Sequence, residues 1–151
     1  MMLNGWLKKT TDMETKFNFN SQIATTIKQS ERLLALGLKK ETADMWYPHF
    51  AKTCPIPMID EVLTTDDIPA WSLGRLIEML PSPISISEDL PTFHYCAFPN
   101  LSNDSVGYYW EDYDGAGRAL VGFTGNGFFA AVVEAIEWLI KEEYFPKEYL
   151  I

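Results

Sequence analysis

The stretch GNGFFAAVVEAIEWLIKEEY, residues 125–144, decides the fold expected for this chain. Its apolar residues recur at helical spacing and its charged residues fall mostly on the other side, which is the pattern of a surface helix. The apolar stripe consists of Phe128, Phe129, Val132, Val133, Ile136, Leu139 and Ile140. We predict a long C-terminal helix over about residues 126–143, with Ile136 buried against another layer of structure and Glu137 exposed.

The layer beneath this helix is predicted to be a sheet. Three aromatic segments are short enough for strands and are separated by turn residues; they are residues 92–98, 106–113 and 118–124. Ile84 and Ile86 alternate with serines, which adds a short edge strand. Because the connections have the composition of hairpin turns, we expect an antiparallel three- to four-stranded meander over about residues 84–124.

The N-terminal half is predicted to be helical. Apolar spacing and cap residues indicate helices over residues 21–36, 41–46 and 70–80, the first starting after Asn20 or Ser21 and ending at Gly37. Gly74 inside the last of these costs about 1 kcal/mol relative to alanine, which favours a close approach by a neighbouring element. The fold class is therefore α+β, with an N-terminal arm (residues 1–20) and a single domain (residues 21–151).

Charge is distributed unevenly along the chain. Lys and Arg total 12 against 21 Asp and Glu, so the net charge is −9; residues 1–52 carry +3 and residues 53–151 carry −12. This balance disfavours nucleic acid and anionic membranes as partners. Glu134 and Glu137 interrupt the longest apolar run, and the N-terminal residues lack the pattern of a signal peptide, so a cytoplasmic location is expected.

The residue types that bind metals are few. They are His49, Cys54, His94 and Cys96, which match a zinc ligand set in number but not in the spacing of paired ligands. A Cys–His nucleophile pair from the same residues would have to form across the fold. We therefore expect no metal, no cofactor and no catalytic residue.

Two other clusters have chemical alternatives. Gly122, Gly125 and Gly127 lie between a predicted strand and a helix, but the spacing is not that of a phosphate-binding loop, which favours a tight turn with Asn126 or Gly127 at positive φ. The acidic residues Glu111, Asp112 and Asp114 lack the ligand series of a calcium loop. A small hydrolase that uses His94 or the turn at Asp112 and Asp114 remains the enzyme alternative.

The predicted binding residues are Tyr108, Tyr109, Trp110 and Tyr113. Alternate residues of a strand point to opposite faces, so one helix cannot cover all four rings. Exposed tyrosine and tryptophan are frequent anchors in protein interfaces. We therefore expect a surface on the sheet that binds a protein partner or a second copy.

Three blocks of sequence carry a family resemblance. ETADMWYP (residues 41–48), DDIPAWSLGRLIEMLP (residues 66–81) and EAIEWLIKE (residues 134–142) resemble uncharacterised small proteins of gut Bacteroidales genomes, often in prophage or other mobile-element neighbourhoods. The resemblance covers about residues 21–141 and implies an α+β, cytoplasmic accessory protein of a mobile element, with no active site to transfer. The function expected is a non-enzymatic protein-interaction module; an acidic decoy that inhibits a nucleic-acid enzyme is an alternative.

Overall fold

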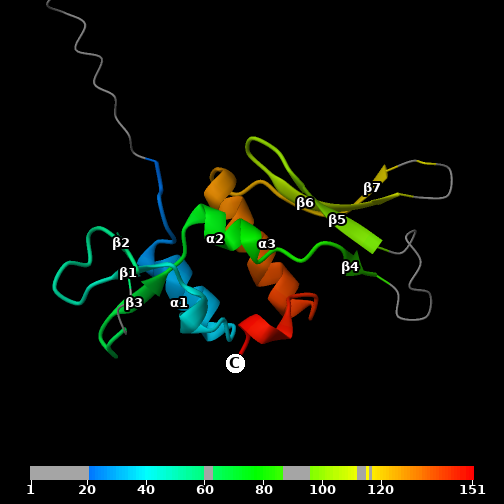
Figure 1. Cartoon of the computed structure of the whole chain (residues 1–151). Coiled ribbons are helices and arrows are strands. Elements are labelled where there is room, and N and C mark those ends of the chain that lie inside the picture. Colours follow the sequence, from blue (N-terminus) through cyan, green and yellow to red (C-terminus); the bar gives the residue numbers. More distant parts are fainter. Residues whose placement is uncertain (1–20, 60–62, 87–95, 112–114, 116) are drawn as a thin grey trace, which may run out of the picture.

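The computed structural model describes residues 21–59, 63–86, 96–111, 115 and 117–151. Over these residues the chain forms two antiparallel sheets, with strand orders β2-β1-β3 and β4-β5-β6-β7, and three α-helices (Figure 1). The helices lie between the two sheets. The α+β class is confirmed.

The four-stranded sheet is the predicted meander. It consists of β4 (Ile84–Ser85), β5 (Cys96–Leu101), β6 (Val106–Glu111) and β7 (Gly117–Phe123), each antiparallel to the next. Residues 92–95 and 112–113, also predicted as strand, lie outside the described residues. Strand β5 runs on to Leu101 through Pro99 because β4 pairs only with Cys96 and Ala97, so from there β5 has a neighbour on one side only.

Helix α3 (Phe128–Lys141) packs against this sheet and has 14 residues, four fewer than predicted. Gly127 is the N-cap residue, and its φ of 100° is a value that glycine adopts readily and other residues adopt rarely. At the other end, the helix stops before Glu143, which has a φ of 62°. Ile136 is fully buried, as predicted. The prediction for Glu137 was wrong: its side chain is 14% exposed, and Oε1 lies 2.9 Å from Nε of Arg32.

Helix α1 (Ile27–Ala35) is shorter than the predicted helix over residues 21–36. Thr26 and Gln29 form a capping box, so the helix starts there and not at residue 21. Before it, Thr25 exchanges hydrogen bonds with the backbone of Trp71, whose N–H donates to the Thr25 hydroxyl at 3.0 Å. Gly37 ends the helix at a φ of 94°, as predicted.

The three-stranded sheet was not predicted. Residues 41–46 do not form the expected α-helix: a 3₁₀ turn (Lys40–Thr42) leads into β1 (Met45–Tyr47), which pairs with β2 (Ile56–Pro57) and β3 (Ile68–Ala70). The residue before a proline avoids helical conformation, and Trp46 and Tyr47 favour strands, so Pro48 explains the difference.

Helix α2 (Leu73–Glu78) occupies the middle of the predicted helix 70–80. Ser72 caps it by accepting from the Arg75 N–H, and Asp44 accepts from both the N–H and the hydroxyl of Ser72, which holds residues 68–72 extended. The explanation expected for Gly74 was wrong. This glycine is exposed, and an added Cβ would meet only the Ser72 hydroxyl, at 3.9 Å.

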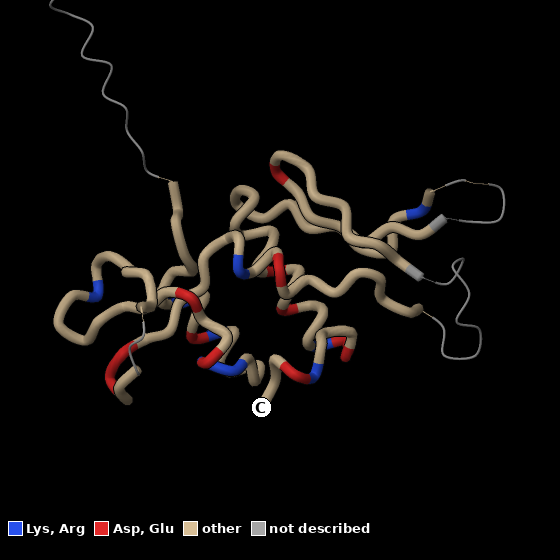
Figure 2. Tube along the Cα trace, in the orientation of Figure 1, with Lys and Arg blue, Asp and Glu red and all other residues tan. Residues whose placement is uncertain are grey.

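The main core lies where α3 meets the sheet and the other two helices. Its largest fully buried side chains include Trp71, Tyr108, Leu33, Leu76 and Ile136. A smaller cluster of Ala24, Met45, Tyr47 and Ala70 supports the three-stranded sheet. Charged residues gather on the helices and the loops around the three-stranded sheet, whereas the described part of the four-stranded sheet carries few (Figure 2).

Candidate functional site

The sheet separates the predicted binding residues. Tyr108 is fully buried beside Trp138 of α3, its hydroxyl donates to the Pro81 carbonyl at 2.9 Å, and burial raises its pKa. It is therefore a core residue and not part of a surface. Tyr109, the next residue, points to the opposite face and is 42% exposed. Tyr113 lies outside the described residues.

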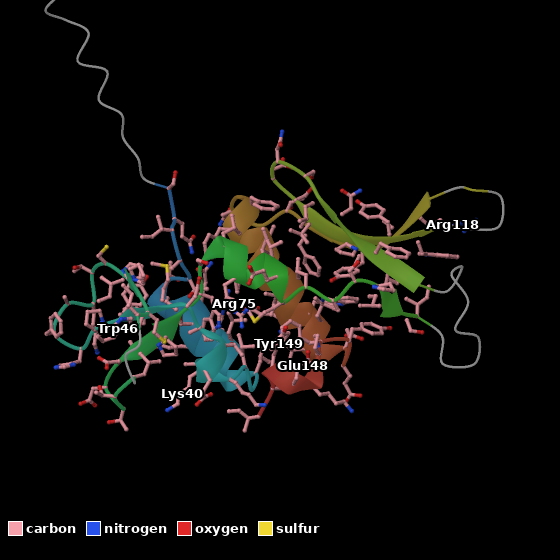
Figure 3. The ribbon with its side chains drawn as sticks, in the orientation of Figure 1. Lys40, Trp46, Arg75, Arg118, Glu148 and Tyr149 are labelled. Atoms are coloured by element: carbon pink, nitrogen blue, oxygen red, sulfur yellow. The ribbon has the colours of Figure 1, made fainter. Side chains whose placement is uncertain are left out.

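Trp110 takes an intermediate position. It packs in part against the main core, and the guanidinium carbon of Arg118 lies 5.9 Å from the centre of its ring. Arg118 is the register partner of Trp110 on β7, so the cation is stacked within the sheet. Figure 3 shows Arg118 at one end of the molecule and Trp46, in the three-stranded sheet, at the other.

The face of β5, β6 and β7 that points away from α3 is the candidate binding surface, hereafter the outer face. By strand alternation and register it comprises Phe98, Asn100, Gly107, Tyr109, Gly117, Ala119 and Gly122. Two aromatic rings, Phe98 and Tyr109, are register partners on β5 and β6. On β7 the same face carries only glycine and alanine.

A hollow of about 520 Å³ lies along β5, β6 and the start of β7. It is lined by Phe98, Pro99, Asn100, Leu101, Tyr109, Trp110 and Gly117. A Cβ atom placed on Gly117 or on Gly122 would meet nothing within 4 Å, so a bound group can approach the backbone of β7. Leu101 of this lining is 42% exposed, and Leu120 of β7 adds further apolar surface with an exposure of 38%.

The glycines after β7 form a tight turn between the strand and α3. Gly125 and Gly127 have φ values of 45° and 100°, and a Cβ on Gly125 would lie 2.8 Å from the Ala131 backbone nitrogen. The tight strand-to-helix turn with Gly127 at positive φ is confirmed. Glycine is required there by conformation and by the close approach of the helix.

His49 pairs with Asp67, whereas a zinc ion and a cysteine were the partners considered for it from the sequence. Its Nδ1 lies 3.2 Å from Oδ1 of Asp67, which also accepts from the His49 N–H, while Oδ2 accepts from the hydroxyl and N–H of Thr64. The Thr64 hydroxyl is the main cause that lowers the pKa of Asp67 to about 2, although desolvation opposes it. The residues are 18 positions apart, and no spacing pattern indicated the pair.

The remaining predicted chemical groups do not assemble into a site within the described residues. His94, Asp112 and Asp114 lie outside them, and the Cys54 thiol is exposed with the Pro55 carbonyl as its contact at 3.6 Å. In the part of the chain that is described, no group of three or more His, Cys, Asp or Glu side chains is placed to hold a metal. No helix of that part is long and apolar enough to cross a bilayer.

Comparison of the chain with protein-family models, with curated proteins and with solved structures finds no match.

Proposed function

We propose that this chain is a non-enzymatic protein-interaction module and that it binds its partner through the outer face. The observation that supports this most directly is the combination of an exposed Tyr109 with a neighbouring face of β7 that carries only glycine and alanine and is open above Gly117 and Gly122. We place the module in a mobile element because residues 21–141 resemble uncharacterised small proteins that often occur in mobile-element neighbourhoods.

The chemistry of the surface suits a protein partner. Interface centres are depleted in charge and enriched in aromatic residues, and Arg118 is the only charged side chain described on β7. Tyr109 offers a rigid ring with a polar hydroxyl, the type of side chain that most often contributes strongly to binding. Gly117, Ala119 and Gly122 leave space in which a partner's side chains can lie against the strand.

The test uses a substitution that fills this space without disturbing the fold. Gly122→Thr adds a β-branched side chain where a Cβ meets nothing and φ is not positive, so the strand is expected to keep or gain stability. Affinity capture from the native host, with the full chain as bait, should recover a partner that the Gly122→Thr protein recovers at least about tenfold less well, a loss of about 1.4 kcal/mol.

A matched pair of leucine and isoleucine variants locates the surface. Leu120→Ser removes an exposed aliphatic side chain beside the outer face, and Ile59→Ser removes one that is 73% exposed near the three-stranded sheet. Weaker capture by Leu120→Ser with unchanged capture by Ile59→Ser is expected. Equal capture by both variants and by Gly122→Thr would contradict the proposal.

A further inference from the structure

Within the part of the chain that the structure describes, the two sheets have four edge strands, and three of these are short and contain or follow a proline. Strand β2 has two residues and contains Pro57, β3 has three and contains Pro69, and β4 has two and follows Pro83. Short edge strands and prolines are the usual devices that prevent further strands from adding to a sheet. The open part of β5 beyond β4 contains Pro99.

Strand β7 is the exception. It has seven residues and no proline, five of the seven residues are exposed, and among the described strands its only neighbour is β6. The Arg118 guanidinium is stacked on Trp110 of the adjacent strand, so its charge is not directed along the edge of β7, where it would oppose an added strand. A register irregularity sets Leu120 apart, but residues 121–123 pair continuously with β6. This edge therefore remains competent to accept another strand.

The N-terminal arm contains a sequence suited to that edge. In METKFNFN, residues 13–20, Met13, Phe17 and Phe19 alternate with Glu14, Lys16, Asn18 and Asn20 at the period of a strand. The four-residue spacing of Met13 and Phe17 fits a helix equally well, but Phe19 fits only the period of two. Residues 1–20 carry a net charge of +1 and the remainder carries −10, so the arm is attracted to the rest of the chain.

Geometry assigns the arm to a second copy. Residues 17–20 can extend at most about 14 Å from residue 21. In Figure 1 the blue segment that precedes α1 lies beside the three-stranded sheet, and the labelled strand β7 lies on the other side of α2 and α3. A domain of this size is roughly 35–40 Å across, and residue 20 must stay within about 4 Å of residue 21, so a strand that runs along β7 is more readily supplied by the arm of a second copy than by the arm of the same chain.

We propose that residues 13–20 of one copy add as a fifth strand to β7 of a second copy. The rings of Phe17 and Phe19 then have room on the outer face, where Gly117 and Gly122 are uncovered. The same packing already exists within one copy, where the ring of Tyr109 covers Gly107. The proposal depends on the proposed function because it names the occupant of the outer face and its edge.

Complementation between two full-length variants tests the pairing. The arm variant carries Phe17→Asp and Phe19→Asp; its control, Asn18→Asp with Asn20→Asp, has the same charge at positions of the opposite parity. The edge variant carries Leu120→Lys, with Ala119→Lys as a second version in case the first unfolds; both sites are exposed. Sedimentation velocity over about a hundredfold range of concentration measures association, and circular dichroism confirms folding.

The unmodified protein and the control are expected to form dimers or longer chains, because each copy offers one arm and one edge. The arm and edge variants should each associate at least about tenfold more weakly, a change of about 1.4 kcal/mol. An equimolar mixture of the two should form a one-to-one dimer, because one supplies an intact edge and the other an intact arm.

Three results would overturn the pairing: an unmodified chain that stays monomeric at every concentration, a mixture of the variants that fails to associate, or an arm variant that self-associates normally. Host capture separates these failures from failure of the proposed function, because a partner that is recovered by the arm variant but lost with Gly122→Thr leaves the outer face as a binding surface for another protein.

Discussion

In strand β6 the ring of Tyr109 lies over the Cα atom of Gly107. A Cβ built on Gly107 would be 2.8 Å from Cε2 of that ring and 2.9 Å from the backbone oxygen of Val121. Gly107 is buried although it belongs to the outer face, because its neighbour's ring takes the place of a side chain. Tyr109 therefore covers the backbone of β6 at Gly107 and still keeps 42% of its surface exposed.

Replacing Gly107 by alanine should destabilise the domain by about 1–3 kcal/mol, because the added methyl group displaces the ring and meets backbone that cannot move away. Gly122 is its register partner on β7 and faces open space, so Gly122→Ala should be neutral or stabilising by up to about 1 kcal/mol. Urea unfolding of the two variants gives the comparison. Similar losses for both would show that Tyr109 does not occupy the space above Gly107.

Glu143 follows the C-terminal end of α3 in a left-handed backbone conformation, which glycine adopts more readily than glutamate. Its φ is 62°, its N–H donates to the Ile140 carbonyl at 3.2 Å, and the following Tyr144 N–H donates to Leu139 at 2.9 Å. Glu143→Gly should therefore stabilise the protein by about 0.5–1 kcal/mol. Glu142→Gly, one residue earlier at a φ of −89°, should not, and thermal unfolding of the two exposed variants distinguishes them. A loss with Glu143→Gly would argue against this helix end.

The Arg32–Glu137 ion pair joins α1 to α3 at 2.9 Å, with the carboxylate largely enclosed and the guanidinium half exposed. A double-mutant cycle with Arg32→Ala and Glu137→Ala should give a coupling free energy of about 0.2–1 kcal/mol. A coupling of zero would show that the pair is not formed in solution.

Ile136→Ala, at the adjacent buried position, should lower the free energy of unfolding by about 2–5 kcal/mol. A small effect at Ile136 would mean that α3 presents another side to the core.

Asp67 makes stability depend on acid pH. Its pKa is about 2 in the folded protein, below the ordinary value of 3.8, so the unfolded chain takes up a proton first as the pH falls. The stabilisation is complete above about pH 4 and is lost as the pH falls toward 2. The difference in melting temperature between the unmodified protein and Asp67→Asn should therefore be constant above about pH 4 and shrink below it. A difference that persists at pH 2 would contradict this origin.

The parts of the fold that were predicted correctly have strong local signals. The wide apolar stripe defines α3, and the turn residues define the meander of β4 to β7. The three-stranded sheet was missed because its strands have two or three residues each and because β1 pairs with residues 56–57 and 68–70, contacts that no periodic pattern records. The extended backbone before α2 likewise depends on Asp44, which comes from another element.

The candidate site was predicted in outline only. Strand alternation placed Tyr108 and Tyr109 on opposite faces, but the side that α3 covers depends on tertiary packing. The small residues Gly117, Ala119 and Gly122 can be seen in the sequence. That they form part of one face becomes clear only from the strand register, which pairs Ala119 with Tyr109 and Gly122 with Gly107. The His49–Asp67 pair had no such signal.

The backbone around Gly37 is joined to residues made much later in synthesis. The Ile151 N–H donates to the Gly37 carbonyl, the Lys39 N–H donates to the Tyr149 carbonyl, and the Lys39 ammonium donates to the Glu148 carbonyl across 109 positions. A ribosome must therefore release residues 148–151 before the C-terminal end of α1 gains these partners. We expect a nascent chain that is halted after α3 to leave this region open to proteases, even though both sheets are already complete in sequence.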